Sequence, residues 1–314
     1  MAVEITEEFV WQSIPPRARD SHKGTFGSVL AVAGSAFYRG AALLAAEGAL
    51  RTGAGIVTLA SVEPVVSAAV TRLPECCLCP CKEGAQGGIA PENVPLLRRQ
   101  KATVLLLGPG LGGTAQSAAR ATETRTLVQQ LLPGFVGAAV LDADGLNATA
   151  QLLAEGKPFP HPAGELVVTP HPGEMARLTG LSAAALATDR EGIALRYAKA
   201  WNAVVVLKGA RTVVASPDGR VCVNPTGNPG RQRGCTGWDA CGAAGLRSAR
   251  LPSCCLCGIS ARCRRRPRRR KARRVRDAAP RYPAGTGRIV CGKPKINEKR
   301  QLHKTPCSCR FLLL

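Results

Sequence analysis

A histidine enclosed by two prolines is the most specific candidate for chemistry in this chain. The segment Pro170–Glu174 reads Pro-His-Pro-Gly-Glu and directly follows an apolar run. The prolines restrict the backbone on both sides of His171, and a helix is predicted to begin at Gly173, so the imidazole should face a cleft. A single histidine is more often structural, but its position after a strand favours a ligand-binding role.

Two carboxylates, Asp142 and Asp144, flank an alanine, again directly after an apolar run. On an extended chain both side chains would point to one side, which suits a hydrated magnesium ion or a ligand hydroxyl. The alternative is an Asx turn that caps the following helix. The sequence leaves both interpretations open.

Two further segments are suited to anions. One is the run Lys208, Gly209, Ala210, Arg211 and Thr212. It would place an ammonium group, several amides and a hydroxyl after a strand, where a nucleotide phosphate could lie. The other is the glycine-rich segment Gly108–Gly113, which precedes a helix and leaves free amides for an anion. Each of the two could instead be only a tight turn.

The order of apolar runs indicates which elements position these motifs. Short continuous apolar runs alternate with alanine-rich stretches, which is typical of strands buried on both faces of a parallel sheet. The predicted strands are Val29–Ala33, Ile56–Ala60, Val104–Leu107, Ala138–Leu141, Leu166–Thr169 and Val204–Leu207, and the predicted helices are Gly40–Arg51, Ala115–Leu132 and Asp189–Trp201. This order predicts an α/β fold with a doubly wound, mostly parallel sheet. Ligands bind such sheets beyond the carboxyl ends of the strands, where the four motifs fall.

The last patterned stretch predicts a β-hairpin. Thr212–Ala215 and Arg220–Asn224 are joined by Ser-Pro-Asp-Gly, which is typical of a hairpin with an Asp-Gly turn.

The N-terminus and the early cysteines predict a cytoplasmic protein. Residues 1–8 are acidic without the apolar region of a secretory signal, and no stretch approaches the ~20 apolar residues of a membrane span. In the cytoplasm Cys76, Cys77, Cys79 and Cys81 would remain reduced, and their crowding favours a loop or edge strand over a disulfide or a metal site.

The composition changes abruptly at Gly230. Residues 231–314 contain 23 of the 43 basic residues but only three of the 21 acidic ones, giving a formal charge of +20, whereas residues 1–230 carry +2. We therefore divide the chain into a domain at 1–230 and a basic, cysteine-rich tail at 231–314, which we expect to be disordered or misfolded. GC-rich DNA read out of frame yields this composition, so the tail is interpreted as a product of a shifted reading frame.

Together the motifs resemble the ADP/ATP-dependent NAD(P)H-hydrate dehydratases, a branch of the ribokinase-like fold. The resemblance covers about residues 10–230 in the family's order. The segments that carry it are His22–Gly27, Gly34–Ala41, Arg51–Gly55, Gly108–Gly113, Asp142–Asn147, Thr169–Glu174, Lys208–Gly209 and Asn224–Gly230.

The resemblance implies a three-layer α/β/α fold, a homo-oligomer and a repair reaction. Hydrated NADH or NADPH (NADHX or NADPHX) would be phosphorylated on its ring hydroxyl by ADP or ATP with Mg²⁺, and loss of phosphate would regenerate the cofactor. The residues implied for the hydrated dinucleotide are Ala41, Gly110, Gly112 and His171, with Asp142 and Asp144 as further candidates. Those implied for the adenine nucleotide are Lys208 to Thr212, and no residue is assigned as a metal ligand.

The sequence departs from the family just after Gly230. There the family has Met-Ala-Thr-Gly-Gly-Thr-Gly-Asp, whose glycine amides form an anion hole and whose aspartate is the base. This chain instead reads Arg-Gln-Arg-Gly-Cys-Thr-Gly-Trp-Asp, which resembles a Thr-Gly-Asp sequence interrupted by Trp238. Asp239 is then the candidate base. Because a 1 Å misplacement can reduce a rate ~100-fold, we expect little or no activity.

Two other functions are compatible with parts of the sequence. A small-molecule kinase of the same fold would share the sheet, although His22–Gly27 and the His171 segment argue against it. A nucleic-acid-binding protein could use the arginine runs of the tail, which would attract any polyanion without specificity. The tail lacks zinc-site cysteine spacings and the interleaved aromatic residues of single-strand binders.

Overall fold

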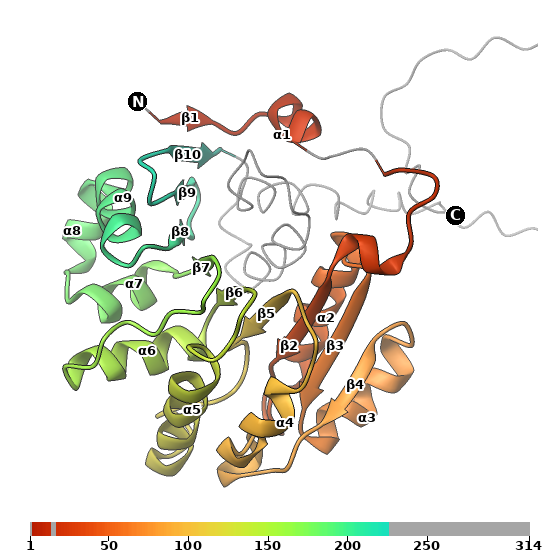
Figure 1. The fold of residues 1–314 in the computed structure, drawn as a ribbon. Coiled ribbons are helices and arrows are strands. Elements are labelled where there is room, and N and C mark those ends of the chain that lie inside the picture. The colour runs from red at the N-terminus through yellow and green to blue at the C-terminus, as the bar shows by residue number, and fades with distance from the viewer. Residues whose placement is uncertain (1, 14–16, 226–314) are drawn as a thin grey trace, which may run out of the picture. The chain divides into compact units, whose positions relative to one another are not determined.

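Ten strands of the described residues form one sheet, in the order β1-β10-β9-β8-β7-β6-β5-β2-β3-β4 (Figure 1). The computed structural model describes residues 2–13 and 17–225, so the tail and Asp239 lie outside the described part. The strands are β1 (Val3–Glu4), β2 (Ser28–Val32), β3 (Ile56–Ser61), β4 (Cys77–Pro80), β5 (Val104–Leu107), β6 (Ala138–Leu141), β7 (Leu166–Val168), β8 (Val204–Leu207), β9 (Thr212–Ala215) and β10 (Val221–Asn224). All neighbours from β8 to β4 are parallel, and β9 runs antiparallel to both β8 and β10.

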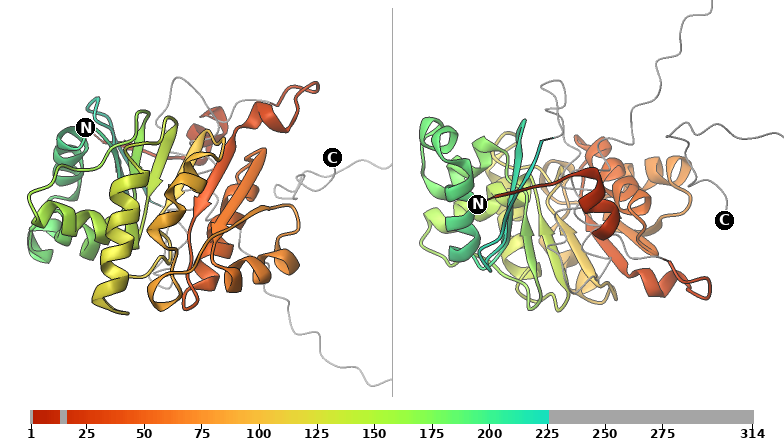
Figure 2. Two further views of the ribbon diagram at one scale, coloured as in Figure 1. Left: turned by 60° about the horizontal axis from the view of Figure 1, so that its bottom comes forward. Right: turned by 90° about the horizontal axis from the view of Figure 1, so that it is seen from above.

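Helices pack on both faces of this sheet, which makes the fold a three-layer α/β/α arrangement (Figure 2). The helices are α1 (Glu7–Ser13), α2 (Arg39–Arg51), α3 (Glu63–Arg72), α4 (Val94–Arg98), α5 (Ala118–Leu131), α6 (Asp144–Ala154), α7 (Pro172–Thr179), α8 (Ala183–Thr188) and α9 (Arg190–Ala200). Helices α2 and α3 contact each other and strands β2 to β4, whereas α4 to α9 pack against one another in succession. Parallel crossovers are right-handed, so the reversal of strand order at β2 and β5 places these two groups on opposite faces.

The predicted strands match the observed ones to within one residue at each end. The hairpin is also confirmed, because β9 and β10 pair around the predicted turn and Gly219 has a φ of +99°. Helix α5 begins later than predicted because the Ser117 side chain accepts the Arg120 amide at 3.0 Å and caps the helix there. Helix α7 begins at Pro172, one residue before the predicted start.

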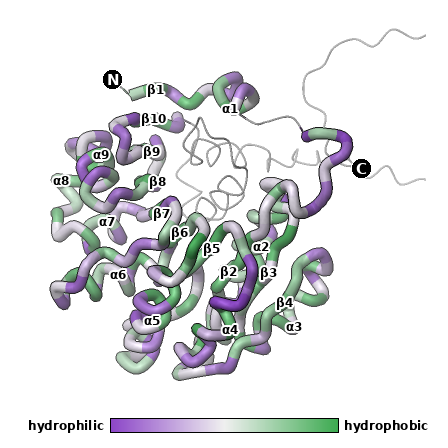
Figure 3. Tube along the Cα trace, viewed as in Figure 1, coloured by the Kyte–Doolittle hydropathy of each residue, from purple (hydrophilic) through white to green (hydrophobic). Residues whose placement is uncertain are grey.

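The core consists of aliphatic strand residues with helical alanines packed against them. The four residues of β5 are 0–1% exposed, and the hydrophobic colouring in Figure 3 follows the central strands. The small side chains of Ala42, Ala45, Ala46 and Ala49 give α2 a flat buried face that lies close to the sheet. Both faces of the central strands are covered, which explains why they read as continuous apolar runs instead of alternating ones.

The early cysteines lie at the edge of the sheet. Cys77 and Cys79 belong to β4, the outermost strand beside β3, as the edge prediction requires. Cys76, Cys79 and Cys81 are buried and Cys77 is exposed, and all are free thiols. None of the helices in residues 2–13 and 17–225 is long and apolar enough to cross a membrane.

The strand order reverses between β2 and β5, so the chain continues from these two strands to helices on opposite faces of the sheet. Open α/β sheets bind ligands at such a point, outside the carboxyl ends of the strands. The amide of Gly34, after β2, donates to the carbonyl of Pro109, after β5, at 2.7 Å. The loop that leads from β2 to Ala41, at the start of α2, is therefore joined to the loop that carries Gly110 at the switch point.

Candidate active site at the carboxyl ends of the strands

Four polar residues meet where β6, β7 and β8 end, and we call them the strand-end cluster: Asp142, Thr169, Glu174 and Lys208. The Lys208 Nζ lies 2.8 Å from the Asp142 Oδ1 and 3.7 Å from the Glu174 Oε2. The Thr169 hydroxyl donates to the same Asp142 oxygen at 2.7 Å. Asp142 and Glu174 are each only 5% exposed. Lys208 thus acts first as the counter-ion of two buried carboxylates.

The cluster holds two acids and one base, so its charge depends on Glu174. Burial raises the pKa of the Glu174 carboxyl and the nearby Asp142 raises it further, while Lys208 opposes both effects. The Glu174 Oε2 also accepts the His171 amide at 2.8 Å, which favours the ionised form. Removing Lys208 would leave two like charges buried together.

His171 precedes α7 and caps it. Its Nδ1 accepts the amides of Gly173 at 3.0 Å and Glu174 at 3.4 Å, while its Nε2 lies 3.3 Å from the Glu174 Oε1. A neutral ring that accepts at Nδ1 carries its proton on Nε2. Burial lowers the pKa of His171, and the positive charges of Lys208 and Arg177 lower it further, so the neutral form is favoured. The side chain is 48% exposed and stands beside the strand-end cluster.

Two glycines of the glycine-rich segment, Gly108 and Gly110, pack where a side chain would not fit. Gly108 has a φ of +129°, and a Cβ there would lie 1.9 Å from the Asp142 carbonyl oxygen. At Gly110, with a φ of +69°, a Cβ would meet Tyr38 and Ala41 at 2.8 Å. The loop after β5 therefore lies directly against the start of α2, and it brings Ala41 and Gly110 together.

Asp142 and Asp144 point in different directions. Ala143 between them has φ +51° and ψ −116°, so the extended chain assumed from the sequence is not observed, and helix α6 has no side-chain cap there. Asp142 faces Lys208, whereas the Asp144 Oδ2 accepts the Gly112 amide at 2.9 Å. Burial raises the pKa of Asp144, and the Gly112 amide partly offsets this. The two carboxylates do not converge on one cation.

The five residues predicted for the adenine nucleotide fall into three environments. Lys208 points into the strand-end cluster, residues 209–211 are exposed, and Thr212 is buried at the start of β9. The Thr212 hydroxyl donates to the Gly209 carbonyl at 3.1 Å. The guanidinium of Arg190 donates to the carbonyls of Leu207 and Lys208 at 3.0 and 3.1 Å and fixes the turn. A Cβ at Gly209 would lie 2.5 Å from that guanidinium, so a side chain at this position would displace the group that holds the turn.

A cleft of about 470 Å³ opens beside Gly112 and Asp144, between α5 and α6. Its lining includes Tyr38, Thr114, Gln116, Ala121, Thr124, Asn147, Ala148, Ala150, Gln151, Ala154 and Arg177. Sequence reading alone does not predict it, because its walls come from four separate segments.

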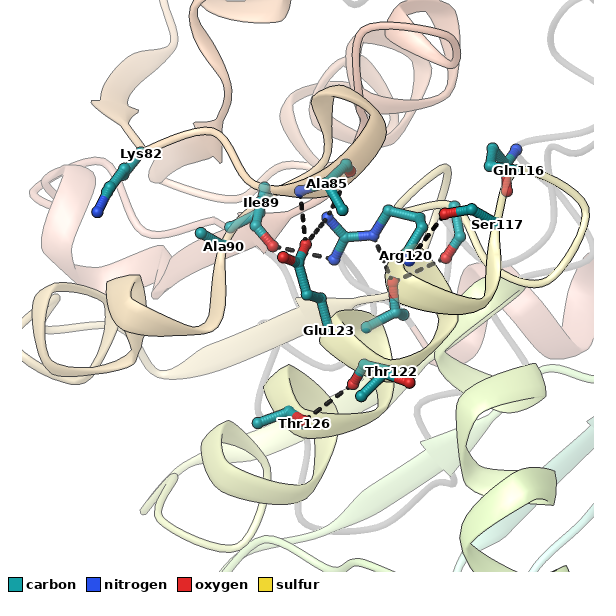
Figure 4. A network of polar contacts seen from close by, with 12 residues as sticks. Lys82, Ala85, Ile89, Ala90, Gln116, Ser117, Arg120, Thr122, Glu123 and Thr126 are labelled. Carbon is teal, nitrogen blue, oxygen red and sulfur yellow. Dashed lines mark hydrogen bonds and ion pairs between the residues drawn. The ribbon is translucent and has the colours of Figure 1, made fainter.

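A buried arginine fixes the loops around this cleft. Figure 4 shows Arg120, a residue of α5 that is 0% exposed, with its side chain directed at the segment from Ala85 to Ile89. Its guanidinium donates to the Ile89 carbonyl at 3.0 Å and pairs with Glu123 at 2.9 Å. Its Nε donates to the Thr124 hydroxyl at 3.1 Å, which in turn donates to the Gly112 carbonyl at 2.8 Å. Arg120 therefore joins the glycine-rich loop to a segment about 30 residues earlier in the chain.

Sequence analysis missed Arg120, Arg190 and the cluster role of Glu174. Both arginines lie within predicted helices, where an arginine reads as a surface residue, and the first is buried only because loop carbonyls surround it. Glu174 was part of the histidine motif, yet its pairing with Lys208 depends on β7 and β8 being neighbours.

Among residues 2–13 and 17–225, no three histidine, cysteine or carboxylate side chains gather in a way that could hold a metal ion. One carboxylate oxygen of Asp142 and one of Asp144 already accept hydrogen bonds from protein groups. A magnesium ion at this site would thus take most of its ligands from phosphates and water.

Comparisons with known proteins show which family this sequence resembles. The profile of the NAD(P)H-hydrate dehydratase family matches residues 29–246, a range that includes Asp239. The bifunctional NAD(P)H-hydrate repair enzyme Nnr of Moorella thermoacetica is 44% identical over 228 residues, which are 72% of this chain and 41% of that enzyme. This chain thus spans about two fifths of the length of that bifunctional relative. The ADP-dependent (S)-NAD(P)H-hydrate dehydratase of Bacillus subtilis is 35% identical over 74% of this chain and 76% of the enzyme.

Solved structures show the same fold. The ADP/ATP-dependent NAD(P)H-hydrate dehydratase from Bacillus subtilis, co-crystallized with ATP and Mg²⁺, superposes with a TM-score of 0.64 and 30% identity over 82% of this chain and 85% of the other. A ribokinase-like superfamily protein from Enterococcus faecalis reaches 0.67 at 23% identity over 82% and 84% of the two chains, which supports the fold alone. The range matched by the family profile and the identity with the Bacillus subtilis dehydratase place this chain in the NAD(P)H-hydrate dehydratase family, and the solved structures place it in the ribokinase-like fold.

Proposed function

We propose that this chain binds hydrated NADH or NADPH together with ADP or ATP, and that its site is built to regenerate the reduced dinucleotide. The observation that carries the proposal is the strand-end cluster beside the switch point, in a chain that matches the dehydratase family from 29 to 246. The hydrated ring would lie near Ala41, Gly110 and His171, and the nucleotide near Lys208–Thr212.

The proposed reaction has two steps. The ring hydroxyl oxygen attacks the terminal phosphorus of the donor, and the bond to the bridging phosphoanhydride oxygen breaks, releasing AMP from ADP or ADP from ATP. The hydroxyl proton passes to a base. The phosphate then leaves with the C–O bonding electrons, and the neighbouring ring carbon loses a proton to form the double bond. Catalysis of such a transfer consists mainly of positioning and charge stabilisation.

The described residues supply the positioning. Lys208 is held by Asp142 and Glu174, which fixes its ammonium group at the edge of the sheet where the phosphates would lie. Neutral His171 carries its proton on Nε2, 3.3 Å from the Glu174 Oε1, and the exposed part of its ring would lie beside the hydrated ring. A bound Mg²⁺ would neutralise part of the charge on the nucleotide phosphates.

The base is proposed to be Asp239, which lies outside the described residues. The inserted Trp238 separates it from Thr236-Gly237, so we expect the chain to bind both ligands but to turn over slowly. A displaced base can lower the rate by roughly 100-fold or more.

The test measures binding and turnover separately on the full chain. Hydrated NADH is titrated calorimetrically, and NADH, AMP and phosphate are quantified after incubation with ADP and Mg²⁺. We expect binding with little turnover, and equal amounts of the three products once Trp238 is deleted. A second variant replaces residues 231–239 with Met-Ala-Thr-Gly-Gly-Thr-Gly-Asp, and Asp239→Asn in the Trp238-deleted chain is the control. Failure to bind hydrated NADH would contradict the proposal. So would phosphoryl transfer to thiazole or pyrimidine alcohols, which are substrates of the alternative, a small-molecule kinase.

Three further features belong to the same proposal. We propose a cytoplasmic location, where the reduced dinucleotides are used, and a homo-oligomer as the resemblance implies. The basic residues of 231–314 would attract polyanions without specificity. Binding of a nucleic acid that disappears with added salt would show that this attraction is electrostatic.

A further inference from the structure

We propose that the cleft between α5 and α6 receives the adenosine half of the hydrated dinucleotide, and that Arg177 binds the pyrophosphate that joins the two halves. The inference rests on the proposed function and extends it to residues that no comparison assigns. It starts from the position of the cleft, which begins at Gly112 and Asp144 and continues along α6.

The sheet order separates the cleft from the phosphate donor. The donor segment Lys208–Thr212 follows β8, whereas Gly112 follows β5 and Asp144 follows β6. In the order β8-β7-β6-β5-β2, the cleft lies at β5 and β6, next to the ring site, and β7 stands between it and the donor segment. A dinucleotide whose ring lies near Gly110 can therefore extend into the cleft without reaching the place of the donor after β8. We assign its second nucleotide to this cleft.

The walls of the cleft suit an adenosine. Ala148, Ala150 and Ala154 on α6 form a wall with short side chains, against which a flat purine can lie. Gln116 and Gln151 bring amide donors and acceptors to the same space. The volume of about 470 Å³ falls within the usual range for small-molecule sites, roughly 300 to 1,000 Å³.

Arg177 stands between the cleft and the histidine. It lines the cleft and donates to the Asn147 side chain on α6. One of its nitrogens lies 3.8 Å from the position of a Cβ on Gly173, so the guanidinium also adjoins the first turn of α7. Its charge reaches His171, since it helps to lower that pKa. A guanidinium at this point can pair with a pyrophosphate through two parallel hydrogen bonds.

The experiment compares two probes on the full chain by calorimetry: hydrated NADH, and hydrated reduced nicotinamide mononucleotide, which lacks the adenosine half. Ala154→Trp fills the outer end of the cleft at an exposed position, and we expect about a tenfold weaker affinity for hydrated NADH with unchanged affinity for the mononucleotide. Arg177→Gln should weaken both probes about tenfold, since each retains a phosphate.

Two matched controls make the same changes elsewhere. Ala184→Trp on α8 and Arg196→Gln on α9 replace exposed residues outside the cleft lining and should leave both affinities unchanged. Equal affinity of the unsubstituted chain for the two probes, or no effect of Ala154→Trp, would overturn the inference and leave the proposed function standing. Failure of the unsubstituted chain to bind either probe would overturn both.

Discussion

Replacing Arg120 with methionine should destabilise the domain far more than the same change at Arg125, five residues later on α5. Methionine keeps most of the apolar stem but removes the guanidinium. The Ile89 carbonyl then loses a 3.0 Å donor, and Glu123 loses a 2.9 Å ion pair. A buried acceptor without a partner costs ~1–3 kcal/mol, and breaking a buried ion pair costs ~3–5 kcal/mol.

The partial exposure of Glu123 makes the expected destabilisation smaller than the sum of these two costs. Its side chain is 27% exposed and keeps the Ala85 amide at 2.9 Å, so part of its charge remains solvated. We therefore expect Arg120→Met to lower the free energy of unfolding by about 3–4 kcal/mol. Arg125 is 28% exposed and pairs with a 36% exposed Glu155, and an exposed pair of this kind contributes ~0–1 kcal/mol.

Urea unfolding followed by tryptophan fluorescence measures the difference. With a slope of about 1–3 kcal/mol per molar urea, the Arg120 variant should shift its midpoint by more than about 1 M and the Arg125 variant by much less. Arg120→Lys keeps the positive charge but not the several planar donors of the guanidinium, so it should recover only part of the lost free energy of unfolding. Equal shifts for the methionine variants at 120 and 125 would refute the view that Arg120 holds these loops.

Three further results are expected. Lys208→Met removes the ammonium group that pairs with two buried carboxylates and that lowers the pKa of Glu174; unfolding by urea should show a loss of about 3–5 kcal/mol at neutral pH that shrinks as pH falls and Glu174 protonates. Burial raises the pKa of Asp144 above its ordinary 3.8, so ionisation of this carboxyl opposes folding, and the free energy of unfolding falls as pH rises from 3.8 through the folded pKa. Asp144→Asn should remove this part of the pH dependence of stability. An unchanged pH dependence would contradict the assignment to Asp144. Burial raises the pKa of Cys76 to about 11 and of Cys81 to about 12, so iodoacetamide at mildly alkaline pH should modify exposed Cys77 before Cys76 and Cys81, as peptide mass mapping would show. Early modification of Cys76 in the folded chain would contradict the burial argument.

The strands were predictable because each is a continuous apolar run followed by glycine or a polar residue. Val104–Leu107 could be assigned without any knowledge of its neighbours, because a strand covered on both faces needs apolar side chains at every position. The short edge strands were harder. β1 has two residues and β4 reads Cys-Leu-Cys-Pro, so both are too short to carry a clear hydrophobic period.

The sequence by itself determined the order of the strands along the chain, the places where ligand-binding loops must follow them, and the abrupt change in composition at Gly230. These are local properties of neighbouring residues. Only the tertiary structure decided that Lys208 pairs with Asp142, 66 positions earlier, and that Asp142 and Asp144 diverge at a residue with positive φ. It also decided that Arg120 is buried and that a cleft opens beside Gly112. The reason is physical: the role of a charge depends on which groups surround it and on its exclusion from water, and both follow from how distant strands and helices pack.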